Sequence, residues 1–272
     1  MKTPPVVLIT GCSSGIGFAL AKAFHNNGCI TYASARKLSA LDKLAALGIH
    51  TVSLDVTDPA SIAAAVTQIN RQHGTVDILV NNAGIPVMGP VAELPLEELR
   101  RQWDTNLTGQ IATVQAVVPA MMQQKSGRIV NVGSVSGLLT TPFAGPYCAS
   151  KAALHSLNDA LRMELKPFGI DVLLVQPGGI ESNFGASAQA QTQNHPWKLY
   201  AQFADGIAKR AGASQEHATP THVFAQQFVR EVLAAKPRVL IRLGAGSGLL
   251  PRLAQLPMAL KDKILMKRFG LA

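Results

Sequence analysis

Two side chains in the middle of the sequence have the types and spacing needed for proton transfer. Tyr147 and Lys151 are four residues apart, and a helix that begins near Pro146 would place both on one face. An ammonium group beside a phenol favours the phenolate, so we expect Lys151 to lower the pKa of Tyr147 from about 10 towards the working pH. Tyr147 would then serve as a general acid or base. Taken alone, such a pair more often makes a surface contact on a helix.

A third side chain, Ser134, offers a hydroxyl thirteen residues before Tyr147. A serine hydroxyl can hydrogen-bond the oxygen of a carbonyl or an alcohol, which is the atom that gains or loses the proton. Ser136 lies close by in the sequence, and we leave it out of the candidate set. Cys148, next to Tyr147, is more often a packed small apolar residue than a nucleophile.

A glycine-rich turn near the start of the chain has the composition of a phosphate-binding loop. The run Thr10–Gly17 contains Gly11, Gly15 and Gly17, and it lies between a predicted strand and a predicted helix. In that context backbone N–H groups can approach a phosphate, and the helix N-terminus adds partial positive charge. A plain tight turn is the alternative for the glycines alone, but the flanking elements favour a nucleotide site.

Five motifs in fixed order resemble those of the short-chain dehydrogenase/reductase family, in its single-domain branch. They are the T-G-x-x-x-G-x-G turn, the N-N-A-G segment Asn81–Gly84, Asn106 in W-D-T-N-L, Ser134 with the Y-x-x-x-K pair Tyr147 and Lys151, and Pro177-Gly178. The resemblance covers about residues 5 to 245. It implies a nicotinamide-dependent oxidoreductase with a Rossmann-like fold.

The resemblance also implies a role for each catalytic candidate. Tyr147 would move the proton, Ser134 would orient the substrate oxygen, and Lys151 would tune Tyr147 and bind the nicotinamide ribose. Asn106 would hold a water that connects Lys151 to solvent. The cofactor-binding candidates are Gly11, Ser13, Ser14, Gly15, Ile16, Gly17, Asp55, Val56, Asn82, Ala83, Gly84, Tyr147, Lys151, Pro177, Gly178 and Ser182.

The segment Tyr32–Lys37, at the end of the second predicted strand, indicates which nicotinamide cofactor is used. It contains no Asp or Glu, whereas an NAD-preferring site usually places one there to bind the ribose 2′-OH. Arg36 can stack on the adenine and pair with a 2′-phosphate, so we expect NADP(H). The alternative is that Arg36 is a solvated loop residue. Many NADP-binding relatives also carry a basic residue where this chain has Ser14.

Two further cofactor contacts are implied by the resemblance. Asp55, backed by the Val56 backbone, corresponds to the family residue that contacts the adenine amino group. Ser182 stands where the family often has a threonine that contacts the nicotinamide carboxamide. Serine keeps the hydroxyl, so this contact remains possible.

Short β-branched runs alternate with longer helical stretches along the chain. The predicted strands are Val6–Ile9, Ile30–Ser34, Thr51–Leu54, Ile78–Val80, Arg128–Val132, Asp171–Val175 and Arg238–Arg242. The main helical stretches are Ile16–Asn26, Ala60–His73, Leu96–Gln124 and Ser150–Lys166. This alternation predicts an α/β fold with a doubly wound parallel sheet of about seven strands. It positions each motif at the carboxyl end of a strand or on the helix that follows.

Two parts of the chain depart from this alternation. Within a single domain spanning residues 1–248, the segment from Ile180 to about Ala218 has little strand character, and we expect a substrate lid there. Residues 249–272 form a predicted amphipathic extension, with a helix that begins near Met258. From Lys236 to the end, eight basic residues and one acidic residue give a net charge of +7, out of +9 for the chain.

The extension has two possible partners. Its apolar face would either pack over the lid or lie on an anionic membrane surface as a basic amphipathic helix. We favour packing against the protein, because the segment is short and lacks tryptophan. Membrane contact remains the alternative.

Composition excludes several classes of protein. Hydrophobic residues make up 47% of the chain, which rules out disorder throughout, and no apolar run reaches the roughly 18 residues of a membrane span. We read no secretion signal, and three unpaired cysteines favour a reducing, cytoplasmic setting. The main body lacks the basic stripe of a nucleic-acid-binding protein, and the histidines show no metal-ligand spacing. We expect a homodimer or homotetramer.

The leading hypothesis is therefore an NADP(H)-dependent oxidoreductase that interconverts an alcohol and a ketone or aldehyde. The lid segment is rich in apolar side chains, namely Phe184, Pro196, Trp197, Leu199, Tyr200 and Phe203. This resembles the branch that acts on steroids, retinoids and other lipophilic alcohols, although a lid that packs only on itself is the competing view. The alternative function is a catalytically idle nucleotide-binding regulatory protein on the same fold. A nucleotide-sugar epimerase would need another glycine spacing and a larger C-terminal domain.

Overall fold

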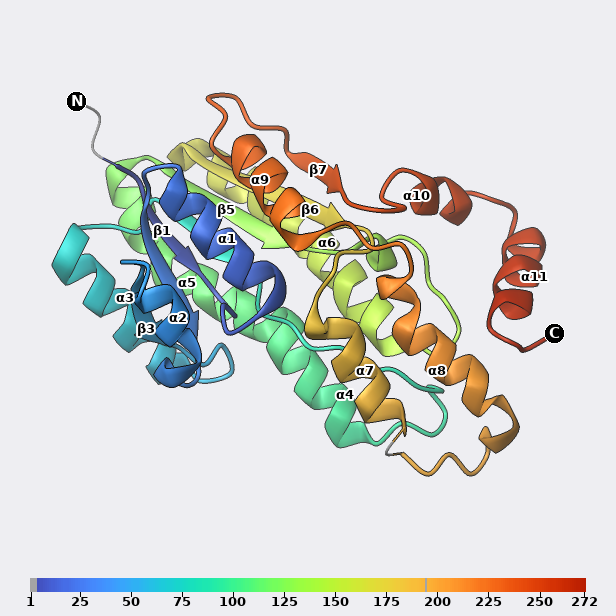
Figure 1. Ribbon diagram of the computed structural model, residues 1–272. Coiled ribbons are helices and arrows are strands. Elements are labelled where there is room, and N and C mark those ends of the chain that lie inside the picture. Colours follow the sequence, from blue (N-terminus) through green and yellow to red (C-terminus); the bar gives the residue numbers. More distant parts are fainter. Residues whose placement is uncertain (1–3, 194) are drawn as a thin grey trace.

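In the computed structural model, which describes residues 4–193 and 195–272, seven parallel strands form one sheet (Figure 1). The strands are β1 (Val6–Ile9), β2 (Ile30–Ala35), β3 (His50–Ser53), β4 (Ile78–Asn81), β5 (Gly127–Val132), β6 (Ile170–Pro177) and β7 (Leu240–Leu243). Their spatial order is β3-β2-β1-β4-β5-β6-β7. The chain builds outward from β1 to β3 and then from β4 to β7, which confirms the doubly wound, single-domain fold.

All seven predicted strands are present, and their ends lie within two residues of the prediction. The prediction works because strands covered by helices on both faces are continuous apolar runs. Every residue of β1 and β4 is buried, for example. The two edge strands are more exposed: only Val52 of β3 and Ile241 of β7 are buried, and β7 begins two residues later than expected.

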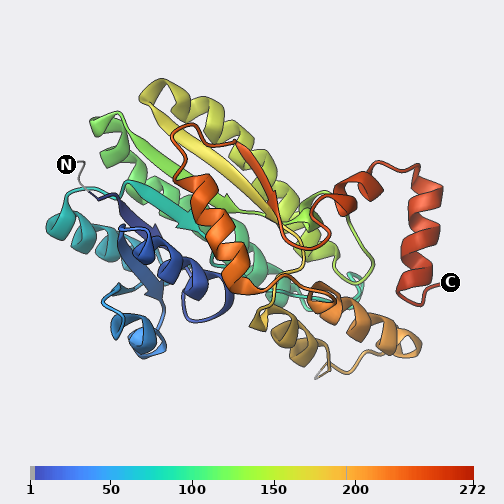
Figure 2. The same ribbon diagram turned by 45° about the horizontal axis from the view of Figure 1, so that its top comes forward.

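Helices cover both faces of the sheet (Figure 2). Their bounds are α1 (Gly15–Asn26), α2 (Asp42–Ala45), α3 (Pro59–His73), α4 (Leu96–Trp103), α5 (Gly109–Gln124), α6 (Gly145–Leu165), α7 (Asn183–Gln193), α8 (Ala204–Gly212), α9 (Thr221–Val232), α10 (Leu249–Ala254) and α11 (Met258–Arg268). Helix α6 has Pro146 in its first turn, as expected from the fixed φ of proline.

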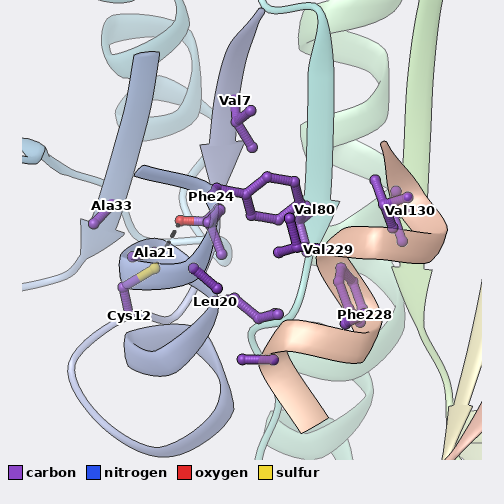
Figure 3. Packing of buried hydrophobic residues seen from close by; sticks show 14 of the residues in the cluster. Val7, Cys12, Leu20, Ala21, Phe24, Ala33, Val80, Val130, Phe228 and Val229 are labelled. Carbon is purple, nitrogen blue, oxygen red and sulfur yellow. Dashed lines mark hydrogen bonds between the residues drawn. The ribbon is translucent and has the colours of Figure 1, made fainter. Parts of the chain in front are cut away.

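On one face, α1 and α9 pack side by side on the central strands. Figure 3 shows Leu20 and Phe24 from α1 meeting Phe228 and Val229 from α9 above Val80 of β4. The rings of Phe24 and Phe228 are 6.3 Å apart and lie edge to face. Burying large side chains fully is worth roughly 1.5–3 kcal/mol each, so this cluster holds the two helices, and the glycine turn before α1, in place.

The opposite face is covered by α3, α5 and α6. Ile62 and Ile69 from α3 pack with Val117 and Met121 from α5. Leu165, the last residue of α6, belongs to the same cluster. This second core therefore anchors the C-terminal end of α6 to the sheet, on the face that includes Ile129 of β5. Tyr147 lies at the other end of the same helix.

The predicted helix Leu96–Gln124 is not a single regular helix. The whole stretch is helical as predicted, but residues Asp104–Thr108 form a π-helical turn between α4 and α5. The π turn adds a residue to the helical repeat, which a pattern of apolar positions does not reveal, and such turns are frequent at functional sites. Asn106 lies at its centre.

The segment after β6 contains α7 and α8, which lie beyond the carboxyl ends of the strands (Figures 1 and 2). The chain after β7 forms α10 and α11, and α11 begins at Met258 as predicted. Leu265 and Phe269 are buried in a cluster with Leu139, Phe143 and Ile207. The C-terminal helices therefore pack against α8 and the loop that leads into α6.

None of the helices within residues 4–193 and 195–272 is long and apolar enough to cross a membrane.

Candidate active site

The carboxyl ends of four neighbouring strands bring the predicted motifs to one edge of the sheet. The glycine turn follows β1, the N-N-A-G segment includes the end of β4, Ser134 lies just beyond β5, and Gly178 directly follows β6. The strands are parallel, so these ends share one edge, and β1 and β4 flank the point where the strand order reverses. This point is where open α/β sheets bind ligands.

The glycine turn is packed too closely for other residues. Gly11 and Gly15 have φ of +74° and +56°, in the left-handed region that favours glycine. A Cβ on Gly11 would lie 2.9 Å from the Cα of Ala83, and a Cβ on Gly17 would lie 2.6 Å from Nδ2 of Asn82. The turn therefore lies directly against the segment that follows β4.

The backbone of this turn fits the phosphates of a dinucleotide. Ser14 is the N-cap of α1, but its side chain accepts no hydrogen bond from the helix, and the first turn contains no acidic residue. Ser13 and Ser14 are exposed, and Gly15, Ile16 and Gly17 form the first turn of α1. Backbone N–H groups at such a helix start favour an anion. The residues present therefore fit a nicotinamide dinucleotide.

Thr10 fastens the turn to the segment after β4. Its hydroxyl accepts hydrogen bonds from the backbone N–H groups of Asn82 and Ala83, both at 3.0 Å. Asn82 Nδ2 donates in return to the carbonyl oxygens of Thr10 and Gly11, at 2.8 and 3.2 Å. Thr10 was not among the predicted site residues, although its place as the first residue of the motif was a usable signal.

Tyr147, Lys151 and Ser134 come together at the base of this edge. Tyr147 and Lys151 lie on consecutive turns of α6, and all three residues are less than one tenth exposed. Lys151 Nζ donates to the carbonyl oxygen of Val132, at 2.8 Å, at the end of β5. The Tyr147 ring lies 5.4 Å from that of Phe184 on α7. The structure therefore brings together the three side chains predicted to handle the substrate oxygen.

Burial, rather than the Tyr147–Lys151 spacing, controls protonation here. Burial raises the pKa of Tyr147 to about 12, although Ser134 and Arg210 act to lower it. Burial also lowers the pKa of Lys151 to about 8. The expectation that Lys151 lowers the Tyr147 pKa below 10 is thus wrong in direction, because loss of solvent outweighs the neighbouring charges. At neutral pH Tyr147 is a protonated phenol and can donate its proton.

Asn106 connects the π turn to this site. Its Oδ1 accepts from the backbone N–H of Ile85 at 2.8 Å, and its Nδ2 donates to the Ile85 carbonyl oxygen at 3.1 Å. A Cβ added to Gly84 would lie 3.3 Å from Asn106 Oδ1 and 3.8 Å from Lys151 Nζ. Gly84 therefore lies close to both Asn106 and Lys151. The side chain of Asn106 fixes the loop after β4, a role that sequence reasoning did not assign to it.

His155 lies directly behind Ser134 and was missed by sequence reasoning. Its Nε2 accepts from the Ser134 backbone N–H at 3.4 Å, and its ring fills the space that Cβ atoms on Gly133 and Gly137 would need. Burial lowers the His155 pKa to about 4, so the ring is neutral at physiological pH. Its position, one turn after Lys151 on the same helix face, was the signal.

The adenine end of the predicted site is more open. Arg36 is exposed directly after β2, and Asp55 lies half-buried beyond β3, beside the buried Val56. Partial burial acts to raise the Asp55 pKa, but hydrogen bonds from Thr57 and the charge of Arg36 lower it below its usual value. Asp55 Oδ1 accepts from the Thr57 backbone and hydroxyl at 2.9 and 2.7 Å. Arg36 and Asp55 are therefore neighbours.

The segment after β6 closes the opposite side. Gly178 has no room for a side chain against the backbone of Ala245. Pro177 is the last residue of β6. Ser182 faces the glycine turn, since a Cβ on Gly15 would lie 3.1 Å from the Ser182 Cβ. The Ser182 hydroxyl donates to the Ile180 carbonyl oxygen at 3.4 Å.

The cysteines and histidines offer no competing chemistry in the part of the chain that the structure describes. Cys12, Cys29 and Cys148 are free and buried. Burial raises the pKa of the Cys12 thiol to about 12 and that of Cys29 to about 11, so both stay protonated. Within the same residues, no group of three or more His, Cys, Asp or Glu side chains is placed to hold a metal ion.

Comparison with known proteins gives a consistent result. A model of the family described as short chain dehydrogenase matches residues 5–193. The short-chain dehydrogenase ptmH of Penicillium ochrochloron is 35% identical over 270 residues, which cover 98% of each chain. An NADPH-dependent 1-acyldihydroxyacetone phosphate reductase of Schizosaccharomyces pombe is 38% identical over 184 residues, or 67% of this chain and 62% of that protein.

A solved structure of a short-chain dehydrogenase from Streptomyces avermitilis superposes with a TM-score of 0.81 at 29% identity, covering 98% of this chain and 95% of the other. The family match spans the glycine turn, the segment after β4 and the Tyr147–Lys151 pair, whose arrangement is described above. The chain belongs to the short-chain dehydrogenase family and is an NAD(P)-dependent oxidoreductase.

Proposed function

We propose that the protein is an NADP(H)-dependent oxidoreductase that interconverts an alcohol and a ketone or aldehyde on a lipophilic substrate. The observation that carries the proposal is the convergence of Ser134, Tyr147, Lys151 and Asn106 beside the glycine turn. When bound, the nicotinamide cofactor supplies or accepts the hydride. An idle nucleotide-binding protein would have no need to keep this set complete and buried.

The chain's own residues perform the proton transfer. In the reducing direction the protonated Tyr147 phenol donates its proton to the carbonyl oxygen as that oxygen gains negative charge. Ser134 donates a hydrogen bond that orients the same oxygen. Lys151 places a positive charge below Tyr147, and Val132 holds its Nζ in position. His155 keeps the Ser134 backbone in place from behind.

Three observations support NADP(H) as the cofactor. Arg36 is exposed at the end of β2, where a ribose 2′-substituent would lie, and Tyr32–Lys37 contains no carboxylate. Asp55 is a nearby carboxylate, but its Oδ1 already accepts two hydrogen bonds from Thr57. One relative is by name NADPH-dependent. Arg36 would pair with the 2′-phosphate.

Apolar contacts around Tyr147 support a lipophilic substrate. Phe184 of α7 packs with Tyr147 and Met88 in one cluster, while Trp197, Tyr200 and Phe203 pack with Phe143 beside α11. Glu93 holds the chain at Leu199 and Tyr200 through their backbone N–H groups, at 3.1 and 3.3 Å. The segment 180–218 would thus act as a substrate lid fastened to the body, rather than pack only on itself. Pro196 and Leu199 are exposed and contribute little to this wall.

The proposal extends to location and assembly. Free buried cysteines fit a reducing cytoplasm. We propose a homodimer or homotetramer, the expectation that came with the family resemblance.

The extension 249–272 packs through its own apolar residues against the protein, which favours a pocket cover over membrane contact.

Steady-state kinetics test the proposal. We expect the purified protein to reduce carbonyl compounds from a panel of a ketosteroid, a retinal-type aldehyde, a long-chain ketone and a small polar ketone, with NADPH preferred over NADH. The apolar members should give the higher kcat/KM. Cofactor binding without turnover of any member would favour the regulatory alternative.

A further inference from the structure

A buried arginine lies next to the candidate active site. Arg210, on α8, is only 7% exposed. Its Nε donates to the Thr141 hydroxyl at 2.5 Å, in the loop before α6. Arginine is almost never buried to this extent unless its charge is compensated.

No protein carboxylate compensates this charge among the residues that the structure describes. The ion pairs found there join other residues, including Arg128 with Asp171 at 3.0 Å and Arg268 with Glu216 at 2.8 Å. Within the same residues, the Thr141 hydroxyl is the one oxygen that accepts a hydrogen bond from Arg210, and the Cys148 thiol also lies within hydrogen-bonding reach of the guanidinium. Leaving a guanidinium buried and unpaired costs several kcal/mol, about the penalty per ion for an incompletely repaid desolvation.

Arg210 lies between the catalytic tyrosine and the C-terminal segment. Its neighbour Ala211 packs in the cluster that contains Tyr147 and Cys148, and Ile207, one turn earlier, packs in the cluster that contains Phe269. The guanidinium carbon lies 6.0 Å from the centre of the Phe269 ring. The Arg210 charge acts to lower the Tyr147 pKa, although burial raises it by more. The two groups are therefore close enough to interact electrostatically.

We propose that Arg210 binds an anionic oxygen group of the substrate, a carboxylate or a phosphate, while Tyr147 acts on the carbonyl group of the same molecule. The inference rests on the proposed oxidoreductase function and narrows its substrate class. With Nε engaged by Thr141, the two terminal nitrogens have no oxygen partner among the described residues, and a planar guanidinium fork suits an oxyanion. The apolar walls and this single charge together select an amphipathic carbonyl compound.

A purely structural role does not account for the charge. Arg210 links Thr141 to the Phe269 ring, and this bridge holds α8 against the loop before α6 and the C-terminal segment. A neutral side chain that hydrogen-bonds Thr141 would make the same link without the desolvation penalty of a buried cation. An incoming anion offsets that penalty, which is the physical reason to keep an arginine here.

Matched pairs of ketones test the inference. The pairs are levulinate with methyl levulinate, acetoacetate with methyl acetoacetate, and dihydroxyacetone phosphate with dihydroxyacetone, each reduced with NADPH. We expect the wild-type enzyme to show a higher kcat/KM for at least one anionic member than for its neutral counterpart. A preference within the keto acid pairs indicates a carboxylate, and a preference within the dihydroxyacetone pair indicates a phosphate. Arg210→Met should lower that preference by about 10- to 100-fold, the range for a hydrogen bond to a charged group. Arg210→Lys should retain part of it, because the charge remains and the fork is lost.

Arg268→Met is the matched control. Arg268 also lies over the Phe269 ring, at 5.7 Å, but its side chain is 48% exposed and pairs with Glu216. We expect this variant to leave the anion preference unchanged. A parallel loss of activity on both members of a pair in Arg210→Met would overturn the inference, because a structural defect affects both alike. Equal activity on both members in the wild type would also overturn it.

Thermal shift separates failure of this inference from failure of the proposed function. The keto acids and dihydroxyacetone phosphate, added with NADPH, should raise the Tm of the wild type more than their neutral counterparts do. Arg210→Met should lose this difference. If no ketone is turned over but the difference persists, the oxidoreductase proposal fails and the anion site stands. If neither turnover nor a difference in Tm depends on Arg210, the anion site is refuted.

Discussion

The side chains that carry the proposed reaction are buried where a charged group loses its hydration. Tyr147 and Lys151 are each less than one tenth exposed, and burial moves their pKa values to about 12 and about 8. Both shifts favour the neutral form, since desolvation penalises phenolate and ammonium alike. An acid that stays protonated until the substrate oxygen becomes basic suits carbonyl reduction.

The first prediction at this scale concerns the phenol oxygen. Tyr147→Phe should lower kcat by about 10²–10⁴, the usual contribution of a general acid or base, while the dissociation constant for NADPH stays nearly unchanged. The ring and Lys151 remain, so the fold and the cofactor contacts are kept. Stopped-flow turnover and NADPH fluorescence titration measure the two effects. A variant with near-native kcat would remove Tyr147 from the mechanism.

The second prediction concerns Arg36. Arg36→Asp should shift the ratio of kcat/KM values from NADPH towards NADH, because a carboxylate repels a 2′-phosphate and accepts from a ribose 2′-OH. Lys37→Ala is the matched control, since Lys37 is an exposed cation at the next position. An unchanged ratio in Arg36→Asp, with a changed ratio in Lys37→Ala, would assign cofactor choice to Lys37.

The third prediction concerns Lys151 and follows from its lowered pKa. Between the native pKa of about 8 and the unfolded value of 10.5, the unfolded chain binds more protons, so stability from this group rises with pH in that window. Below pH 8 the buried ammonium destabilises the fold. Lys151→Met should therefore abolish turnover yet raise the Tm at pH 7 by several degrees, at roughly 2–4 °C per kcal/mol. The gain should shrink as the pH approaches 10.5. A lower Tm at pH 7 would contradict this account.

At the scale of elements, two irregular turns position the site. The π turn Asp104–Thr108 carries Asn106 towards Gly84, and a short 3₁₀ turn, Val135–Gly137, follows Ser134. The Ser134 hydroxyl accepts from the Ser136 backbone N–H at 3.0 Å and caps this turn. Both turns lie against α6, which carries Tyr147 and Lys151. Helix α6 is thus the reference against which the loops after β4 and β5 are set.

The packing of the 3₁₀ turn on His155 leads to the fourth prediction. A Cβ on Gly137 would lie 2.7 Å from the His155 Nδ1, and that ring is confined by its neighbours. Gly137→Ala should destabilise the protein by about 1–3 kcal/mol, as overpacking does, and lower kcat by moving Ser134. Denaturant unfolding and initial rates measure both. Gly248→Ala is the control, because a Cβ there meets no atom within 4 Å. Equal effects of the two substitutions would show that the contact with His155 is unimportant.

At the scale of the whole molecule, two of the hydrophobic clusters hold different parts of the site in place. The cluster of α1 and α9 in Figure 3 holds the glycine turn, and the smaller cluster of Leu139, Phe143, Ile207, Leu265 and Phe269 joins α8, the loop before α6 and the C-terminal helix. The first and last segments of this smaller cluster, at Leu139 and Phe269, are more than a hundred residues apart in sequence. It therefore couples the C-terminal segment to the walls of the proposed pocket.

The fifth prediction follows from this coupling. Truncation after Gly248 removes Leu265 and Phe269, whose burial is worth roughly 1.5–3 kcal/mol each. The truncated enzyme should have a lower Tm and a higher KM for bulky apolar substrates than for small ones, because remote apolar contact is lost. If instead the intact enzyme pellets with anionic vesicles at physiological salt, and truncation abolishes pelleting with unchanged KM, the segment is a membrane-surface anchor.

Local sequence determined the sheet, the motifs and most of the catalytic set. Strands buried on both faces are continuous apolar runs, so their positions and the doubly wound class follow from composition along the chain. The glycines at 11, 15 and 17 are fixed by local backbone geometry and close approach, and these leave a readable spacing. The order of the motifs then placed Ser134, Tyr147 and Lys151 at one sheet edge.

Tertiary structure alone decided the features that depend on surroundings. The direction of the Tyr147 pKa shift depends on burial by residues from α7 and α8, which no local spacing encodes. The π turn at Asn106 and the placement of His155 behind Ser134 arise from packing between elements. Arg210 is an ordinary helical arginine in sequence, and it becomes a buried charge with no carboxylate partner among the described residues only when α8 meets Thr141 and Phe269. Desolvation is a property of the assembled molecule, so these side chains acquire their chemistry only in the folded protein.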